Sequence, residues 1–267
     1  MGMIVMGGQG FVGSAFVRHA EAAGEQCLAL TRENYAQRTG TSCEIFVNAN
    51  GNSRKYLAEH DPTTDFELSV SSVMRSLRDF SAQTYVYLSS TAVYANPGDP
   101  TSATENAEIN PAQLSIYGFH KLLAEALVKR YAQSWLIVRL GGMVGPGLSK
   151  GPIYDLLTTR SVRVGWGSEF QLLSTDFAAR IVYGLIREEV TNQIVNVCGR
   201  GGVVLSRVYE QMFGLPPEPN GLPNEVWRAS PERLRRFVTV PDSEETLKQF
   251  LRSDFARQLL AASRVEA

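Results

Sequence analysis

The sequence has few of the residues on which disulfide-linked and metal-binding proteins depend. Its three cysteines, Cys27, Cys43 and Cys198, are odd in number and far apart, which indicates free thiols in a reducing compartment rather than a disulfide framework. Only three histidines are present, and neither CxxC nor HExxH occurs, so we expect no metal site built from protein ligands.

Charge and hydropathy argue against two further classes of protein. The 26 Lys and Arg residues against 27 Asp and Glu residues give a net charge of −1, which is unlike a nucleic-acid-binding protein. No apolar run approaches the roughly 20 residues that a membrane helix needs. Hydrophobic residues still make up 44% of the chain, enough to bury a sizeable core. We therefore predict a cytoplasmic protein that binds neither nucleic acid nor a membrane.

Short apolar runs alternate with helical patterns through the first half of the chain. Met3–Met6 is a continuous apolar run, typical of a strand buried on both faces. The strands predicted in this way are 3–6, 26–30, 44–47, 85–88 and 136–140, and the helices between them are 11–23, 64–80 and 116–133. This alternation predicts an α/β fold, a Rossmann-type doubly wound parallel sheet.

The alternation weakens after residue 147, which predicts a division of the chain. We place a dinucleotide-binding Rossmann domain at 1–150 and a smaller C-terminal substrate-binding lobe at 151–267. Helix 177–186 and strand 194–197 are candidates to return to the first domain. Two polar helices are expected within 243–264.

The glycine-rich segment directly after the first predicted strand is a candidate phosphate-binding loop. Gly7, Gly10 and Gly13 lead into a predicted helix, which is the context that a dinucleotide-binding motif needs. Glycines let the turn bring the helix N-terminus against a pyrophosphate, whose charge the free N–H groups and the helix dipole stabilise. The alternative is an ordinary glycine-rich turn, but the position at the first strand–helix connection favours cofactor binding.

The end of the second predicted strand bears on the choice of cofactor. An acidic residue there hydrogen-bonds the ribose hydroxyls of NAD, whereas an arginine accepts the 2′-phosphate of NADP. The strand ends at Thr31-Arg32, and a guanidinium offers a two-pronged hydrogen bond to phosphate. Arg32 therefore favours NADP(H), although Glu33, one residue further on, would serve as a ribose ligand for NAD(H).

A tyrosine and a lysine four residues apart form a candidate proton-transfer pair. Tyr117 and Lys121 lie in a predicted helix, where this spacing puts both on one face. A lysine ammonium beside a phenol lowers the phenol's pKa from about 10, which makes the phenol a better proton donor or acceptor near neutral pH. Ser90 follows strand 85–88, at the edge where parallel sheets bind ligands, although such hydroxyls also cap strand ends. His120 is interpreted as an ordinary helix residue.

Five motifs together resemble the extended short-chain dehydrogenases/reductases of the NAD-dependent epimerase/dehydratase family. In the family's order they are GGQGFVG (7–13), LSSTAVY (88–94), YGFHK (117–121), VRLGGMVGPG (138–147) and STDFAARIV (174–182). The resemblance implies a Rossmann fold, a nicotinamide cofactor and a small-molecule substrate, a sugar or nucleotide sugar.

The resemblance also implies a role for each matching residue. Tyr117 resembles the catalytic acid/base, Lys121 the residue that holds the nicotinamide ribose, and Ser90 the hydroxyl that hydrogen-bonds the substrate oxygen. The implied cofactor-binding residues are Gly7, Gln9, Gly10, Phe11, Val12, Gly13, Arg32, Ala49, Asn50, Ser89, Tyr117 and Lys121. The implied substrate contacts are Thr91, Lys150 and Gln171. In relatives, helices 64–80 and 116–133 commonly form a dimer bundle, which makes a homodimer an option here.

The chain departs from the family pattern at three places. Only eleven residues separate Arg32 from Glu44, where the family usually has a further helix and strand, so we expect an abbreviated adenine pocket. Gly142 stands where sugar-nucleotide enzymes commonly carry asparagine. Glu169 stands where many carry an arginine for the substrate diphosphate.

Three functions fit these residues to different degrees. The first is an NADPH-dependent reductase of a keto group, with a nucleotide-linked 4-keto deoxysugar as the candidate substrate. The second is an epimerase or dehydratase that retains NAD, against which Arg32 and the lack of an acid/base pair beside Ser90 both argue. The third is a non-catalytic dinucleotide sensor, which would normally have lost Tyr117 or Lys121. We expect the first.

Overall fold

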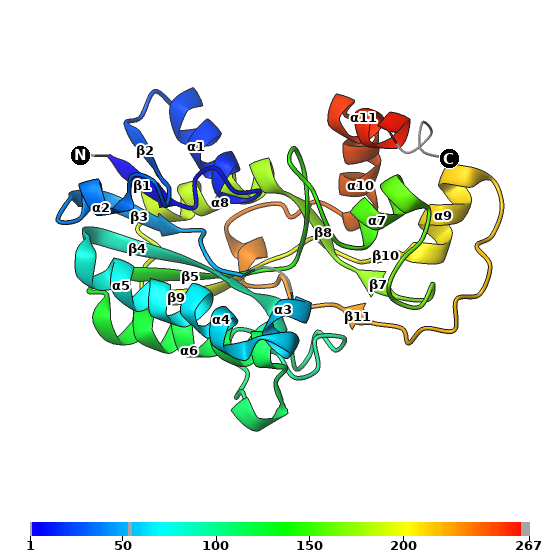
Figure 1. Ribbon diagram of the computed structural model, residues 1–267, viewed down its shortest axis with the longest axis horizontal. Coiled ribbons are helices and arrows are strands. Elements are labelled where there is room, and N and C mark those ends of the chain that lie inside the picture. The colour runs from blue at the N-terminus through cyan, green and yellow to red at the C-terminus, as the bar shows by residue number, and fades with distance from the viewer. Residues whose placement is uncertain (1, 53–54, 263–267) are drawn as a thin grey trace. The chain divides into compact units, whose positions relative to one another are not determined.

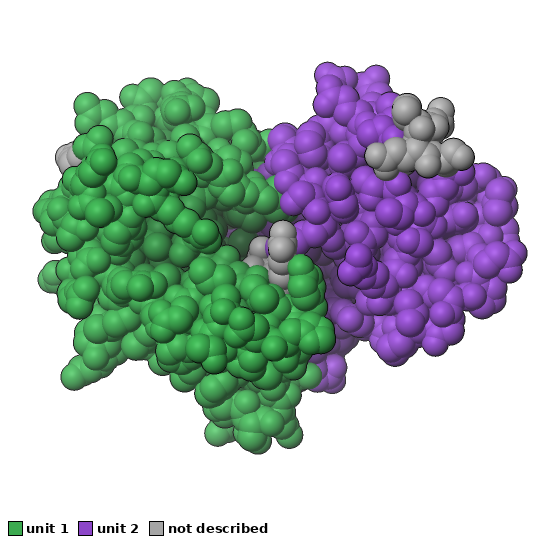
Figure 2. Space-filling model, in the orientation of Figure 1, with its two compact units in different colours: residues 1–95, 105–140, 176–196 green, residues 96–104, 141–175, 197–267 purple. Residues whose placement is uncertain are grey.

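The computed structural model describes residues 2–52 and 55–262, and the chain forms two compact units (Figure 1). Unit 1 contains residues 1–95, 105–140 and 176–196, and unit 2 contains residues 96–104, 141–175 and 197–267 (Figure 2). The chain thus passes between the units several times. The sequence predicted a main division near residue 150 with helix 177–186 and strand 194–197 as candidates to return, and residues 176–196 lie in unit 1. No sequence pattern indicated that segment 96–104 belongs with the later residues.

Unit 1 is built on a six-stranded sheet with the order β2-β1-β3-β4-β5-β9. The strands are β1 (Met3–Met6), β2 (Cys27–Leu30), β3 (Ser42–Asn48), β4 (Ser81–Ser90), β5 (Trp135–Leu140) and β9 (Gln193–Val197). The neighbouring strands from β2 to β5 pair in parallel. Figure 1 shows α1 (Gly13–Ala22) and α8 (Thr175–Arg187) on one side of the sheet, and α5 (Ser72–Asp79) and α6 (Ile116–Tyr131) on the other. This confirms the predicted Rossmann-like α/β fold.

Apolar side chains of the central strands form the core on the α5 and α6 side of the sheet. All four residues of β1 are buried, as its unbroken apolar run predicted. Phe46 of β3 stacks on Tyr85 of β4 with the ring centroids 5.2 Å apart. Val73 of α5 and Val128 of α6 are buried in the same cluster. The helices that carry candidate site residues are therefore anchored directly on the sheet.

The predicted helix 64–80 is interrupted in the structure. It consists of α4 (Pro62–Phe66), a π-helical turn (Glu67–Ser71) and α5. Serine hydroxyls hydrogen-bond the backbone along this stretch, for example Ser72 Oγ to the Leu68 carbonyl at 2.6 Å. Such bonds compete with regular helix geometry and bend helices, which a hydrophobic pattern does not reveal.

The segment between β2 and β3 is abbreviated, as its length predicted. It contains one short helix, α2 (Tyr35–Arg38), and β2 is the edge strand of the described sheet. Asn34 holds the turn after β2, since its Oδ1 accepts from the Thr31 amide at 2.8 Å and its Nδ2 donates to the Ala29 carbonyl at 3.0 Å. The remaining short helices of unit 1 are α3 (Lys55–His60) and the 3₁₀ turns 91–93 and 111–113.

In its described residues, unit 2 combines two small sheets with four α-helices and a 3₁₀ turn at 234–236. One sheet pairs β6 (Gly142–Val144) with β8 (Leu172–Ser174), and the other has the order β10-β7-β11, formed by β10 (Val203–Val204), β7 (Glu169–Phe170) and β11 (Val226–Trp227). The helices are α7 (Pro152–Thr159), α9 (Leu205–Phe213), α10 (Ser243–Leu251) and α11 (Asp254–Ala262). The last two confirm the pair of polar helices predicted within 243–264.

Candidate active site

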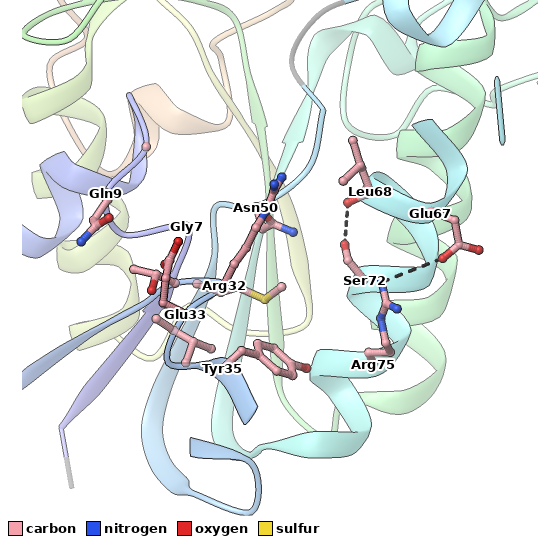
Figure 3. A pocket seen from close by; sticks show the side chains of 14 residues that line it. Gly7, Gln9, Arg32, Glu33, Tyr35, Asn50, Glu67, Leu68, Ser72 and Arg75 are labelled. Carbon is pink, nitrogen blue, oxygen red and sulfur yellow. Dashed lines mark hydrogen bonds and ion pairs between the residues drawn. The ribbon is translucent and has the colours of Figure 1, made fainter. Parts of the chain in front are cut away.

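The sheet of unit 1 creates a ligand-binding crevice where its strand order reverses. The next strands along the chain, β2 and β3, lie on opposite sides of β1, and ligands of open parallel sheets bind beyond the carboxyl ends of strands at such a point. A pocket of about 580 Å³ lies there (Figure 3). Its lining consists of Met6, Gly7, Gln9, Gly10, Leu30, Thr31, Arg32, Glu33, Tyr35, Asn50, Glu67, Leu68, Ser72 and Arg75.

The glycine loop after β1 has a geometry that other residues could not adopt. Gly7 has a φ of 78°, in the left-handed region that glycine occupies without steric cost. At Gly13, an added Cβ would overlap the carbonyl oxygen of Gly7, so glycine is what allows α1 to begin this close to β1. The amides of Ser14 and Ala15 already donate to the carbonyls of Gly10 and Val12, so an anion at this end of α1 would be bound by the preceding loop and the positive end of the helix dipole. Of the predicted loop residues, Gly7, Gln9 and Gly10 line the pocket, whereas Phe11, Val12 and Gly13 do not.

The loop after β3, residues 48–52, lies against the glycine loop and is called here the cofactor loop. A Cβ on Gly7 would lie 3.1 Å from the Ala49 carbonyl oxygen and 3.2 Å from the Asn50 nitrogen. The Asn50 amide donates to Asn48 Oδ1 at 3.0 Å, which fixes the turn. Asn50 lines the pocket. Ala49 does not, and its amide donates to the Met6 carbonyl at 2.9 Å, which ties the cofactor loop to the end of β1.

Both residues that bear on cofactor choice, Arg32 and Glu33, line the pocket. A hydrogen bond from the Thr31 side chain lowers the pKa of the Glu33 carboxyl. A second guanidinium, that of Arg75 on α5, lines the same pocket, 3.9 Å from the Glu67 carboxylate. The sequence analysis did not predict Arg75 as a pocket residue, because no local sequence pattern indicates that α5 lies near the end of β2.

An aromatic side chain from the shortened segment completes the pocket. Tyr35 donates its hydroxyl to Asp79 Oδ2 at 3.0 Å and sets its ring edge-on to Phe80, with centroids 5.3 Å apart. Tyr35 therefore gives the pocket a rigid, partly apolar wall in the region where the family's further strand and helix are absent from the described chain.

The structure brings Ser90, Tyr117 and Lys121 together in unit 1. The Ser90 side chain acts on the Tyr117 phenol and favours a lower pKa for it, and the Ser90 hydroxyl itself accepts from the Ala92 amide at 3.2 Å. Lys121 Nζ lies 5.9 Å from the centroid of the Tyr117 ring and donates to the Leu88 carbonyl at 3.4 Å. Both side chains are buried, at 7% exposure for Tyr117 and 6% for Lys121.

Burial dominates the ionisation of this pair. It raises the pKa of Tyr117 to about 12, and Ser90 opposes this shift while Asp65 adds to it. It lowers the pKa of Lys121 to about 8, against the charges of Asp65 and Glu125. The pKa of Tyr117 is therefore raised, whereas the sequence analysis expected it to be lowered, because burial disfavours the charged phenolate. A phenol that keeps its proton at neutral pH suits proton donation.

Ser89 lies in a buried polar network rather than in the pocket lining. Its hydroxyl donates to Glu125 Oε1 at 2.6 Å, and Arg139 donates to both oxygens of the same carboxylate, at 2.9 and 2.8 Å. Arg139 also donates to the Tyr94 hydroxyl at 3.0 Å. This network joins β4 and β5 to α6, the helix that carries Tyr117 and Lys121. The sequence analysis did not identify it.

The three expected substrate contacts are distributed over both units. Thr91 is a buried residue of unit 1, in the 3₁₀ turn that follows β4, whereas Lys150 and Gln171 belong to unit 2. Gln171 is 5% exposed, and its Nε2 donates to the carbonyls of Gly199 and Ala229, both at 2.9 Å. The structure therefore gives Gln171 a packing role within unit 2.

Glu169, the residue in the family's arginine position, is itself paired with an arginine. Arg228 donates to both of its carboxylate oxygens, with Nε 2.7 Å from Oε1. A guanidinium thus stands beside position 169 although the residue at that position is acidic.

Comparison with known proteins agrees with this geometry. The model of the NAD dependent epimerase/dehydratase family matches residues 3–79 and 66–163, more than half of the chain. The chain belongs to this family. No curated protein matches the sequence.

Solved structures of epimerase/dehydratase-like proteins share the fold at low sequence identity. A dTDP-4-dehydrorhamnose reductase from Clostridium acetobutylicum is 16% identical with a TM-score of 0.73, covering 94% of this chain and 98% of that one. A dTDP-glucose 4,6-dehydratase from Streptomyces venezuelae with NAD bound is 15% identical, with a TM-score of 0.75 and coverage of 95% and 98%. A UDP-galactose 4-epimerase is 19% identical, with a TM-score of 0.69 and coverage of 100% and 99%.

Family membership and the pocket together support a nicotinamide-dinucleotide-dependent enzyme. Within residues 2–52 and 55–262, no cluster of three or more His, Cys, Asp and Glu side chains is suited to hold a metal ion. None of the helices in that part of the chain has the length and apolar character needed to cross a membrane.

Proposed function

We propose that this epimerase/dehydratase-family protein is an NADP(H)-dependent oxidoreductase that reduces a keto group on a sugar. The substrate class is a nucleotide-linked 4-keto deoxysugar, and Tyr117 is the proton donor. The observation that carries the proposal is the pairing of a buried, protonated tyrosine with a dinucleotide-type pocket that two arginines line.

Arg32 and Arg75 support NADP(H) rather than NAD(H). Both guanidinium groups line the pocket near the end of β2, where the ribose of the adenosine half binds in this fold. Two guanidiniums provide planar donor sets for a phosphate dianion. Glu67 is the ion-pair partner that a phosphate would displace from Arg75.

The residues of unit 1 divide the remaining chemistry between them. When bound, a nicotinamide dinucleotide supplies the hydride that reduction of a carbonyl needs. Tyr117 holds a proton at its phenolic oxygen and delivers it to the carbonyl oxygen, and the hydroxyl of Ser90 hydrogen-bonds the same oxygen. Lys121 binds the ribose next to Tyr117, and the buried setting excludes water from both groups.

Glu33 supports the alternative of an NAD-retaining epimerase or dehydratase. It lines the same pocket as Arg32 and could bind the ribose hydroxyls of NAD. The nucleotide carried by the purified protein separates the two functions. Tightly held NAD(H) favours the alternative, whereas exchangeable NADP(H) favours the reductase.

Titration of NADPH and NADH by fluorescence tests the cofactor part of the proposal. Arg32→Ala should weaken NADPH binding by about 1.5–3 kcal/mol, the usual range for a hydrogen bond to a charged group, with little change for NADH. Arg75→Ala should act in the same direction, and Arg78→Ala, which removes an exposed arginine one turn further along α5, is the matched control. Equal losses for both nucleotides would refute recognition of the 2′-phosphate.

A further inference from the structure

A buried carboxylate on another helix contacts the helix that carries Tyr117 and Lys121. Asp65 of α4 is 0% exposed, although an aspartate is rarely buried without a strong reason. No part of the sequence analysis assigned it a role.

The two oxygens of Asp65 connect the cofactor loop to the helix that carries the catalytic pair. Oδ2 lies 2.6 Å from Nδ1 of His120, the residue directly before Lys121 in α6. Oδ1 accepts from Nδ2 of Asn52, at the end of the cofactor loop, at 2.7 Å. His120 and Asn52 are each 6% exposed, so these bonds are shielded from water. His120 is therefore part of a defined polar contact rather than an ordinary helix residue.

Lys121 is enclosed by groups from several elements. The rings of Tyr87 on β4 and Tyr117 on α6 lie 5.2 and 5.9 Å from its Nζ. A Cβ added to Gly51 of the cofactor loop would be 3.5 Å from the same Nζ. The carboxylates that act on it are Asp65 from α4 and Glu125 from α6.

The two carboxylates differ in how their charge is matched. Glu125 accepts two hydrogen bonds from the guanidinium of Arg139, a permanent cation, whereas His120, the partner of Asp65, is charged only when it is protonated. Asp65 accepts from the neutral amide of Asn52 and the hydroxyl of Ser69, and pairs with His120. Asp65 is therefore the better candidate to stabilise a buried ammonium.

We propose that Asp65 is a positioning residue for the proton-transfer pair: its carboxylate keeps Lys121 charged and ties α6 to the cofactor loop through His120 and Asn52. The inference rests on the proposed function for its catalytic meaning, but its physical content can be measured without substrate.

Removing the charge of Asp65 should lower the pKa of Lys121 and the pKa of Tyr117. Asp65 supports the ammonium of Lys121 against burial, so without it the pKa of Lys121 falls below about 8. Asp65 also raises the pKa of Tyr117, so without it that pKa falls as well. Reduction needs a protonated phenol beside a charged lysine, and the alkaline limb of the pH–rate profile should therefore move to lower pH.

The direct test is an NMR titration of the protein labelled with ¹³C at the lysine side chains, with the Lys121 signal assigned from Lys121→Met. In Asp65→Asn the titration midpoint of Lys121 should fall by about one unit or more. Asp61→Asn is the matched control, because Asp61 lies four residues earlier, outside the pocket, and asparagine also caps α4 well. In Asp61→Asn, the titration midpoint of Lys121 should equal that of the wild type.

Two further variants separate charge from packing. His120→Gln keeps both the Asp65 charge and a donor for it, so the midpoint of Lys121 should be retained. If Asp65→Asn does not fold, the double variant Asp65→Asn with His120→Gln replaces the pair by two amides that can hydrogen-bond and carries the same expectation as Asp65→Asn. An unchanged midpoint in the charge-free variants, or an equal fall in His120→Gln, overturns the proposal.

The outcome is independent of whether the protein is a reductase. If no keto sugar is turned over by the wild type, the proposed function fails while the coupling of Lys121 to Asp65 is still measured. If turnover is found but the alkaline limb and the Lys121 midpoint are the same in Asp65→Asn and wild type, the role of Asp65 is refuted and the function stands.

Discussion

Tyr117 illustrates how burial sets the role of one side chain. Its phenol has little access to water, so the charged phenolate is disfavoured and the group keeps its proton across the neutral range. The Ser90 side chain, at the end of β4, opposes part of this rise in the pKa of Tyr117. An environment that makes Tyr117 a poor base suits the proton donation that we propose for it.

Tyr117→Phe should therefore abolish most of the reductase activity and leave the fold intact. The change removes only the hydroxyl, so the rate should fall by the contribution of one general acid, about 10²–10⁴-fold, while NADPH affinity is retained. Tyr131→Phe is the matched control, because Tyr131 ends the same helix and is exposed. Turnover by Tyr117→Phe near the wild-type rate would remove Tyr117 from the mechanism.

Lys121 is expected to limit the activity at high pH. Its pKa is lowered to about 8, so the ammonium is present below that value and is lost as the pH rises through it. Tyr117, with a pKa raised to about 12, stays protonated throughout this range. The rate of reduction should thus decline above about pH 8, and Lys121→Met should give a low rate without that limb. A wild-type profile that stays flat to pH 10 would contradict this assignment.

At the scale of elements, the sequence predicted the parts of the molecule with a strong period and missed those that depend on polar side chains. The buried strand β1 and the start of α6 at Ile116 were predicted to the residue. Strand β4 begins at Ser81, four residues before the predicted strand, because its exposed polar start carries no apolar signal. The π-helical turn at 67–71 and the Asp65 contacts were also missed, since both depend on hydrogen bonds between residues that are distant or irregularly spaced.

At the junction of β1 and α1, a single added carbon would disturb the pocket directly. Gly13→Ala would bring a Cβ against the backbone of Gly7, which cannot move without displacing the pocket lining. We expect a loss of about 1–3 kcal/mol in stability and a larger proportional loss in NADPH affinity. Gly184→Ala in α8 is the control, because its Cβ would meet no neighbour within 4 Å and should stabilise the helix by about 0.5–1 kcal/mol. Chemical denaturation and nucleotide titration on both variants measure the two effects.

At the scale of the whole molecule, the two units are made of interleaved segments. The strand and helix patterns of the sequence pointed to the return of residues 176–196 to unit 1 but not to the earlier crossing at 96–104. Segment 96–104 belongs to unit 2 although it lies between two segments of unit 1. Within unit 2, backbone bonds join it to later residues, such as the Arg228 amide to the Pro97 carbonyl at 2.5 Å and the Ser230 amide to the Ala103 carbonyl at 2.9 Å. Pairings between residues more than a hundred positions apart leave no local pattern.

The stability of unit 1 should depend more on the buried ion pair between Glu125 and Arg139 than on the surface pair between Glu25 and Arg187. Glu125 is 0% exposed and Arg139 is 2% exposed, and together with Ser89 they join α6 to β4 and β5. Glu125→Ala leaves a buried guanidinium without its carboxylate, so we expect a loss of about 3–5 kcal/mol in the free energy of unfolding. Replacing both partners by Leu and Met should cost much less, because no buried charge then remains unpaired.

Urea denaturation followed through Trp135, in a variant that lacks the other two tryptophans, reports on this pair locally, because Trp135 begins β5 of unit 1. Glu25→Ala provides the comparison. Glu25 pairs with Arg187 at 3.2 Å on the surface of the same unit, and exposed pairs contribute about 0–1 kcal/mol. Equal shifts of the Trp135 transition in Glu125→Ala and Glu25→Ala would show that the buried pair is no more important than a surface one. A double replacement as damaging as Glu125→Ala would place the cost in lost packing rather than in an unpaired charge.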